Sequence, residues 1–181
     1  MFFELLITDE ISLKYYTPDN QFGFKKGVGL DHAHHLISNL LLHAHENNEV
    51  LYFAGLDVSR AFDTGIHPHI FLTAYKHGVN PSVIKSIRDM YKKLNAKVKV
   101  TISPGTVELT PSIPVKKGIR QGAVTSPPLF NNTVIVPQQK VLTTCIFNGI
   151  DVSLANYADD ILDISRTAFG IEENFGILDR E

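Results

Sequence analysis

Hydrophobic residues recur at three- and four-residue spacing between residues 30 and 44, a pattern that predicts an amphipathic helix. Residues 50–56 then form a nearly continuous apolar run, which predicts a buried central strand. Two further helices are predicted over residues 68–76 and 81–94. The first 26 residues show no clear period, so they predict no element.

The second half of the chain is predicted to mix strands with one more helix. Alternation over residues 97–102 and, more loosely, over 113–117 predicts a hairpin-like pair of strands. Ser126 and the two prolines after it open an apolar helical segment, which Pro137 should kink or end. Further short strands are predicted over residues 145–147, 152–154 and 161–164. Helices and strands that do not strictly alternate indicate an α+β fold.

Composition excludes several classes of protein. The 181 residues are 44% hydrophobic and 20% charged, as in ordinary folded proteins. A single cysteine, Cys145, excludes a disulfide framework and a Cys-rich zinc module. No apolar run approaches the roughly 20 residues that cross a bilayer, and Glu4 interrupts an N-terminus without basic residues, so we expect an intracellular protein (nucleus or cytoplasm) that is not secreted. The formal net charge of −2 gives no support to a nucleic-acid partner.

Three carboxylates stand out in this pattern. Asp57 directly follows the apolar run of residues 50–56, and Asp159 and Asp160 are adjacent at a predicted hairpin tip. A divalent cation such as Mg²⁺ or Mn²⁺ would relieve the repulsion between neighbouring acids, and two such ions can promote phosphoryl transfer. Two plainer alternatives stay open at this point: a solvated Asp-Asp turn, and Asp57 as a cap of the next helical turn.

Three stretches, in this order, resemble the motifs of reverse transcriptases. Residues 53–64, with Leu-Asp-Val-Ser-Arg-Ala-Phe-Asp-Thr, resemble the first palm motif, and residues 118–131, with Gly-Ile-Arg-Gln-Gly and Ser-Pro, resemble the second. Residues 157–160, Tyr-Ala-Asp-Asp, match the Tyr-x-Asp-Asp box. The Ala-Phe-Asp-Thr wording and residues 21–27 are most similar to the non-LTR (LINE-type) retrotransposon enzymes.

This resemblance implies a right-hand polymerase palm, an antiparallel sheet packed on helices, with partial fingers and no thumb. Residues 1–49 would be partial fingers, 50–165 the palm with the catalytic motifs, and 166–181 a truncated start of the remaining palm. The implied function is an RNA-directed DNA polymerase that adds deoxynucleoside triphosphates to a primer 3′-hydroxyl on an RNA or DNA template. The missing thumb and fingers segments are expected in a full-length form.

The resemblance also implies a role for each matching residue. Asp57, Asp159 and Asp160 would be catalytic and would hold two Mg²⁺ ions, with Mn²⁺ as a possible substitute. Residues implied to contact the nucleotide or template are Phe62, Arg120, Gln121 and Gly122. Phe62 would exclude a ribose 2′-hydroxyl by sterics, although a plain core ring is the alternative.

A competing hypothesis is a catalytically inactive retroelement relic that acts at most as a weak binding or interaction module. Its motives are the acidic balance, the missing thumb, Pro137, and Asp163 in a strand position that is usually apolar in the family. The basic cluster of Lys92, Lys93, Lys97 and Lys99 is interpreted as a solvated face. His32 and His35 share a helix face, but no third zinc ligand is evident.

Overall fold

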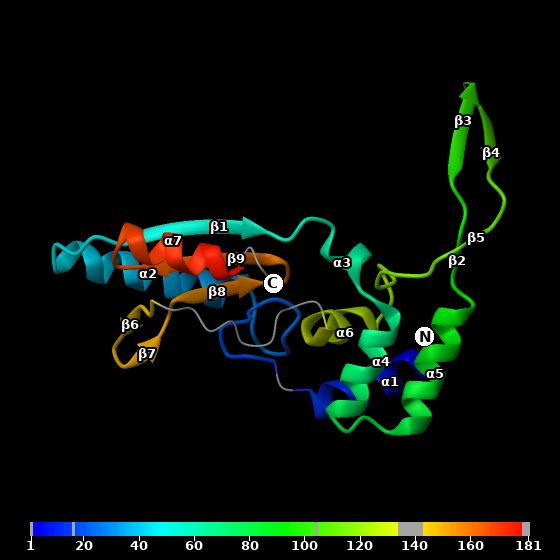
Figure 1. The fold of residues 1–181 in the computed structure, drawn as a ribbon, viewed down its shortest axis with the longest axis horizontal. Helices are drawn as coiled ribbons and strands as arrows, with labels where there is room; N and C mark the ends of the chain where they lie inside the picture. Colours follow the sequence, from blue (N-terminus) through cyan, green and yellow to red (C-terminus); the bar gives the residue numbers. More distant parts are fainter. Residues whose placement is uncertain (1, 16, 104, 134–142, 179–181) are drawn as a thin grey trace. The chain divides into compact units, whose positions relative to one another are not determined.

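The computed structural model describes residues 2–15, 17–103, 105–133 and 143–178, and its elements are labelled in Figure 1. The chain forms two compact units that interleave along the sequence. One comprises residues 1–15 and 62–133; it contains eleven Lys and Arg against six Asp and Glu, a net charge of +5, and is called the basic unit. The other comprises residues 16–61 and 134–181; it contains six against thirteen, a net charge of −7, and is called the acidic unit.

The acidic unit is built on a three-stranded antiparallel sheet. Its order is β1 (Tyr52–Asp57), β9 (Asp160–Ser165), β8 (Leu154–Tyr157). The expectation that the first of these is a buried central strand is wrong: β1 lies at the edge, and Tyr52 and Phe53 are 40% and 37% exposed. The central strand is β9, which pairs with β1 on one side and with β8 on the other, and its last three residues are buried. A continuous apolar run therefore did not identify the strand with two partners.

Two helices pack against this sheet. The predicted helix is confirmed as α2 (Leu30–Glu46), whose Leu40 joins Cys145, Val152 and Ile164 in the core of the unit. The helix α7 (Ala168–Leu178), which the pattern did not predict, packs against β9 and β1. Because side chains alternate along a strand, Ile164 and Asp163 lie on opposite faces of β9, toward α2 and α7 respectively.

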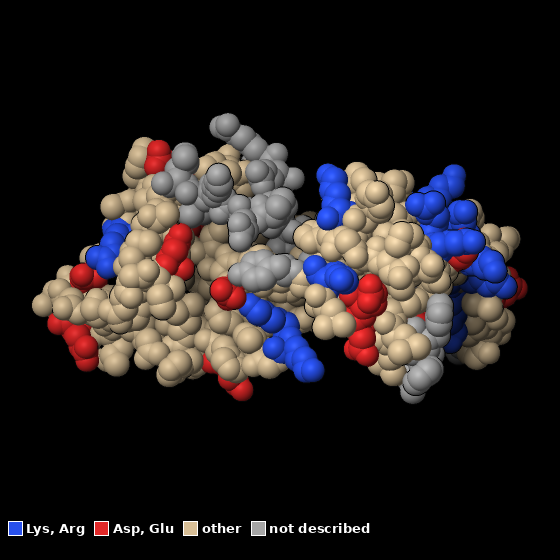
Figure 2. Space-filling model, turned by 90° about the horizontal axis from the view of Figure 1, so that it is seen from below, with Lys and Arg blue, Asp and Glu red and all other residues tan. Residues whose placement is uncertain are grey.

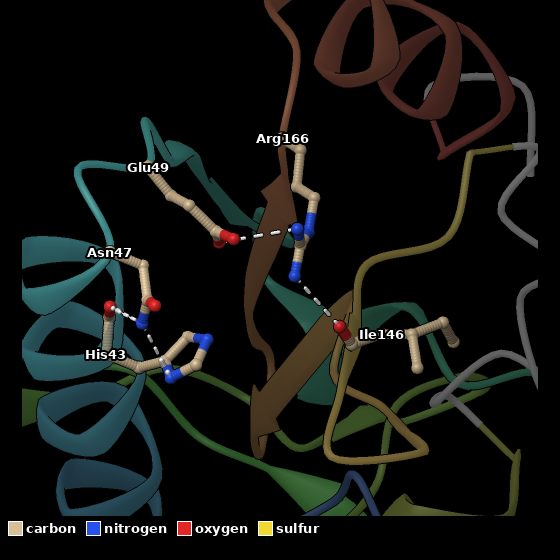
Figure 3. A network of polar contacts seen from close by, with 5 residues as sticks. All are labelled: His43, Asn47, Glu49, Ile146 and Arg166. Atoms are coloured by element: carbon tan, nitrogen blue, oxygen red, sulfur yellow. Dashed lines mark hydrogen bonds and ion pairs between the residues drawn. The ribbon is translucent and has the colours of Figure 1, made fainter.

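A polar network in the acidic unit lies beside the small hairpin of β6 (Ile146–Phe147) and β7 (Ile150–Asp151). Figure 3 shows Arg166 between Glu49, whose Oε2 lies 3.3 Å from Nη1, and the Ile146 carbonyl, which accepts from Nη2 at 3.2 Å. Asn47 donates to the His43 carbonyl at 2.8 Å at the end of α2. These half-exposed contacts join three segments but add little stability.

The basic unit is mainly helical. The predicted helices are confirmed as α4 (His67–Lys76) and α5 (Pro81–Lys92), and Asn80 caps the latter by accepting from Ser82 N at 2.9 Å. They pack with α6 (Ser126–Thr133), which begins at the predicted Ser126 and contacts α1 (Phe2–Lys14). The helix α1 lies in the segment without a clear period. The short α3 (Ala61–Thr64) stands where the two units meet in the sequence, and Pro137 lies outside the described residues.

A long β-ribbon projects from these helices (Figure 1). The predicted pairing of residues 97–102 with 113–117 is wrong: β3 (Lys99–Ser103) pairs with β4 (Thr106–Leu109), and β2 (Asn95–Ala96) pairs with β5 (Ile113–Pro114). The reason is local, since Gly105 with φ of +87° allows a tight turn directly after β3. Within the described residues, no helix is long and apolar enough to cross a membrane.

Candidate active site

The acidic unit brings the three motif acids together. A two-residue turn, Ala158-Asp159, joins β8 to β9, and it places Asp160 directly opposite Asp57 in the register of β1 and β9. Beyond that pair, Val58 N donates to the Asp159 carbonyl at 3.3 Å. Directly opposite residues project to the same face of a sheet, with their Cβ atoms about 5 Å apart. Two carboxylates that lie 103 residues apart in the sequence (160 − 57) therefore share one exposed edge.

These acids fit a divalent cation by their chemistry. Asp57 and Asp160 are both exposed, and neither has an ion-pair partner among the described residues. Like charges placed directly opposite destabilise a sheet, and oxygen donors suit Mg²⁺ or Mn²⁺. Within the described residues, no three His, Cys, Asp or Glu side chains are gathered closely enough to hold a metal ion. The protein thus offers paired carboxylates, while water and phosphate oxygens would have to complete a coordination shell.

A buried glutamine, which sequence reasoning missed, holds the turn of Ala158 and Asp159. The Gln21 side chain is fully buried; its Oε1 accepts from Ala158 N at 2.9 Å and from Gly23 N at 2.7 Å, and its Nε2 donates to the Ala158 carbonyl at 3.2 Å. Ala158 has a φ of +57°, a conformation that costs a non-glycine residue free energy. Gln21 is therefore a positioning residue, because both backbone groups of this strained residue bond to its amide.

The backbone beside Gln21 approaches the same turn very closely. Phe22 N donates to the Asn156 carbonyl, and Asn156 N donates to the Asn20 carbonyl, each at 2.8 Å. A Cβ on Gly23 would lie 2.2 Å from Ala158 N, so only glycine fits there. The sequence signal was the Gln-x-Gly at residues 21–23, inside a segment that contributed to the resemblance without an assigned role.

The second motif is organised inside the basic unit. Its loop packs on the turn that follows Phe62: Ile119 N donates to the Phe62 carbonyl at 2.6 Å and Gly118 N to the Gly65 carbonyl at 2.7 Å. Gly118 has a φ of +94°, and a Cβ there would lie 3.2 Å from Asp63 Cα. Glycine is therefore required for this close approach of two backbones.

Three of the residues implied to contact the nucleotide belong to this loop, and the fourth, Phe62, bonds to it through its carbonyl. The half-buried Phe62 ring stacks on the buried Phe130 ring, with centroids 4.2 Å apart and planes 12° apart. Arg120 is 56% exposed and lies 3.8 Å from Glu4, and its carbonyl accepts from Ser126 Oγ. Gln121 and Gly122 are exposed, and Gly122 has a φ of +78°. The structure therefore groups these four residues in the basic unit and the three acids in the acidic unit.

Asp163 does not face solvent. Its side chain is fully buried, and its Oδ1 accepts from Asn174 Nδ2 of α7 at 3.0 Å, whereas its Oδ2 has no hydrogen-bond partner among the described residues. Asn174 also accepts from Thr143 N and donates to the Thr143 carbonyl, each at 3.1 Å. Burial raises the pKa of Asp163, and the hydrogen bonds from Asn174 and from backbone only partly oppose this. Asp163 thus joins β9 to α7 on the sheet face opposite to Asp57 and Asp160.

Comparison with known proteins identifies the chain. The family model described as reverse transcriptase (RNA-dependent DNA polymerase) matches residues 6–176. The chain belongs to this reverse transcriptase family. Members of the family generally use divalent metal ions and act on nucleic acid and nucleotides. Among curated proteins, the retrovirus-related Pol polyprotein of a type-2 retrotransposable element from Drosophila melanogaster is 25% identical over 155 residues, which supports the predicted non-LTR affiliation.

The reverse transcriptase fold is also confirmed by a solved structure. An apo telomerase from Candida tropicalis, truncated from its C-terminal domain, matches with a TM-score of 0.59 at 11% identity over 97% of this chain. The predicted α+β palm-like fold is thereby confirmed. The match to the Drosophila polyprotein covers 84% of this chain but only 14% of the polyprotein. The match to the telomerase covers 36% of the telomerase chain.

Proposed function

We propose that this reverse transcriptase chain is part of an RNA-directed DNA polymerase that extends a primer 3′-hydroxyl with deoxynucleoside triphosphates on an RNA or DNA template. The observation that carries the proposal is the register pair of Asp57 and Asp160 beside Asp159. This pair supplies neighbouring carboxylate oxygens, which a two-metal site for phosphoryl transfer requires. Residues 50–165 would act as the palm, residues 1–49 as partial fingers, and residues 166–181 as the start of the remaining palm.

Each acid has a proposed task. Asp57 and Asp159 would hold two Mg²⁺ ions, for which Mn²⁺ could substitute, and Asp160 would contribute a further carboxylate. The bound ions would lower the pKa of the primer hydroxyl and neutralise the triphosphate. The contribution of the chain itself is position: the Gln21 amide fixes the turn that carries Asp159, and the β1–β9 ladder fixes Asp57 against Asp160.

The basic unit would handle the incoming nucleotide. Stacking on Phe130 fixes the plane of the Phe62 ring, which would stand against the 2′ position of the sugar and favour deoxynucleotides. The exposed Gln121 and Gly122 would contact the nucleotide and the template, and glycine lets the backbone approach a ligand closely. Arg120 would add a phosphate contact from its half-exposed guanidinium.

Primer extension tests the proposal. A labelled primer on an RNA template is incubated with the protein at low salt, with Mg²⁺ or Mn²⁺ and the four deoxynucleoside triphosphates. We expect extension by the natural chain and by Asp31→Asn, an exposed acid on α2 that serves as a matched control, and none by Asp159→Asn. Absence of extension by the folded natural chain would contradict the proposal and favour the inactive relic.

A further inference from the structure

The basic unit contains a large groove that has no part in the proposed catalytic chemistry. It has a volume of about 850 Å³ and lies between α4, α5 and the segment at β5. Its apolar wall includes Phe71, Leu72, Ile84, Tyr91 and Val115. A groove of this size is within the range of ligand sites, and its wall is hydrophobic enough to hold flat apolar groups.

Among the described residues, the groove is lined by four cations and no carboxylate; the cations are Lys85, Arg88, Lys92 and Lys116. The three on α5 follow one another at spacings of three and four residues, so they form one stripe along the helix. All four are exposed, and the chain continues from α5 into the ribbon with Lys93, Lys97 and Lys99. Figure 2 shows Lys and Arg gathered over the end of the basic unit that carries α5 and the ribbon. These seven cations, called the cation track, therefore continue along the chain beyond the groove.

Aromatic rings lie among these cations. Tyr75 is 67% exposed at the groove, and the Arg88 guanidinium lies 5.5 Å from the centroid of the Phe71 ring. A stripe of cations along a groove with accessible rings is the arrangement that binds single strands, because cations contact phosphates while bases stack on rings. We propose that this groove binds a single-stranded nucleic acid. An acidic peptide would suit the four cations, but it would not use a cation track that extends beyond the groove.

Fluorescence anisotropy with a labelled single-stranded oligonucleotide tests this site, with RNA and DNA of one sequence as separate arms. We expect the double variant Lys85→Gln/Lys92→Gln to bind about tenfold more weakly at about 50 mM salt and to lose about 1.4 from the slope of log K against log salt, at about 0.7 per phosphate contact. The control is Lys14→Gln/Lys26→Gln, which removes two exposed cations outside the groove and should bind like the natural chain. Equal binding by the two double variants would overturn the proposal.

Two further measurements separate nucleic acid from a mere polyanion. Tyr75→Ala should weaken binding by about fivefold or more, whereas Tyr75→Phe keeps the ring and should restore it. Unlabelled polyglutamate of the same charge should compete poorly, because it has no bases to stack; competition as strong as that of an equal length of oligonucleotide would overturn the proposal in favour of an acidic peptide site.

The inference extends the proposed function, but its test is separate from polymerisation. Binding is measured in EDTA without nucleotides, and Asp159→Asn should bind as tightly as the natural chain because Asp159 lies outside the groove. If the natural chain does not extend a primer but binds the oligonucleotide in a way that depends on Lys85 and Lys92, the result counts against the polymerase proposal alone. Intact extension with binding that ignores Lys85 and Lys92 would count against the groove alone.

Discussion

The two units of this reverse transcriptase chain differ most in how they use polar groups. The acidic unit, with a net charge of −7, buries Gln21, Asp163 and Asn174 and bonds them across its sheet. The basic unit, with a net charge of +5, exposes its cations over an apolar groove. Buried hydrogen bonds fix a backbone in one geometry, whereas exposed cations attract a polyanion without fixing it.

This contrast explains why the overall charge misled the sequence analysis. A net charge of −2 gave no support to a nucleic-acid partner, yet it is the sum of two units of opposite sign. Three acids of the acidic unit lie at the proposed metal site, and four cations of the basic unit line the proposed nucleic-acid groove. The charge of a whole chain therefore says little about the partners of its parts.

The largest effect is expected from the exposed acid pair of the acidic unit. Asp57→Asn should lower primer extension by more than about a hundredfold, which exceeds the usual effect of residues that only support metal ligands. The same change removes the like charge opposite Asp160, so the melting temperature should rise slightly. Primer extension and thermal unfolding, each with and without Mg²⁺, measure both effects. Reduced stability together with full activity would show that Asp57 has only a structural role, as a cap of the helical turn that follows it.

The next effect concerns the close approach of Gly23 to the turn of Ala158 and Asp159. Gly23→Ala would place a Cβ 2.2 Å from Ala158 N, and the resulting displacement should lower the free energy of unfolding by about 3 kcal/mol. Gly55→Ala in β1 is the matched control, because nothing lies within 4 Å of its Cβ position. Chemical denaturation of both variants checks the difference. Equal stability would mean that residues 20–23 do not hold the turn as the structure shows.

Sequence patterns predicted the parts of this fold that depend on local signals. The periodicity of apolar residues was enough to predict α2 and α5, because an amphipathic face is a local pattern. The edge position of β1 and the pairing of β3 with β4 were not predicted, because strand partners are set by the whole fold and by a tight turn at Gly105.

The candidate site was predicted unevenly for the same reason. Motif resemblance pointed to Asp57, Asp159 and Asp160, and the sheet register brings them together. Gln21 could not be assigned from the sequence, since its partner Ala158 is 137 residues away and bonds through its backbone. A backbone partner leaves no trace in residue type, so such contacts need a structure.

A smaller effect is expected at the buried acid of the acidic unit. Because burial raises the pKa of Asp163, the unfolded chain loses this proton at lower pH than the folded chain, and stability falls as pH rises from about 4 through the raised pKa. Asp163→Asn keeps an acceptor for Asn174 without a titrating group. Its melting temperature should exceed that of the natural chain at pH 7 and converge with it in acid, as thermal unfolding across pH would show. A less stable variant at pH 7 would contradict this assignment.

The smallest effect is expected in the ribbon of the basic unit. All residues of β3 and β4 are exposed, including Val100, Ile102, Val107 and Leu109. Replacing residues 99–109 with a short Gly-Ser turn should therefore leave the melting temperature nearly unchanged, because almost no buried apolar area is lost. The same change removes Lys99, so nucleic-acid affinity should fall by no more than a few-fold. A large drop in melting temperature would show that the ribbon stabilises the fold, and the contrast between a fixed acidic unit and an open basic one would then fail.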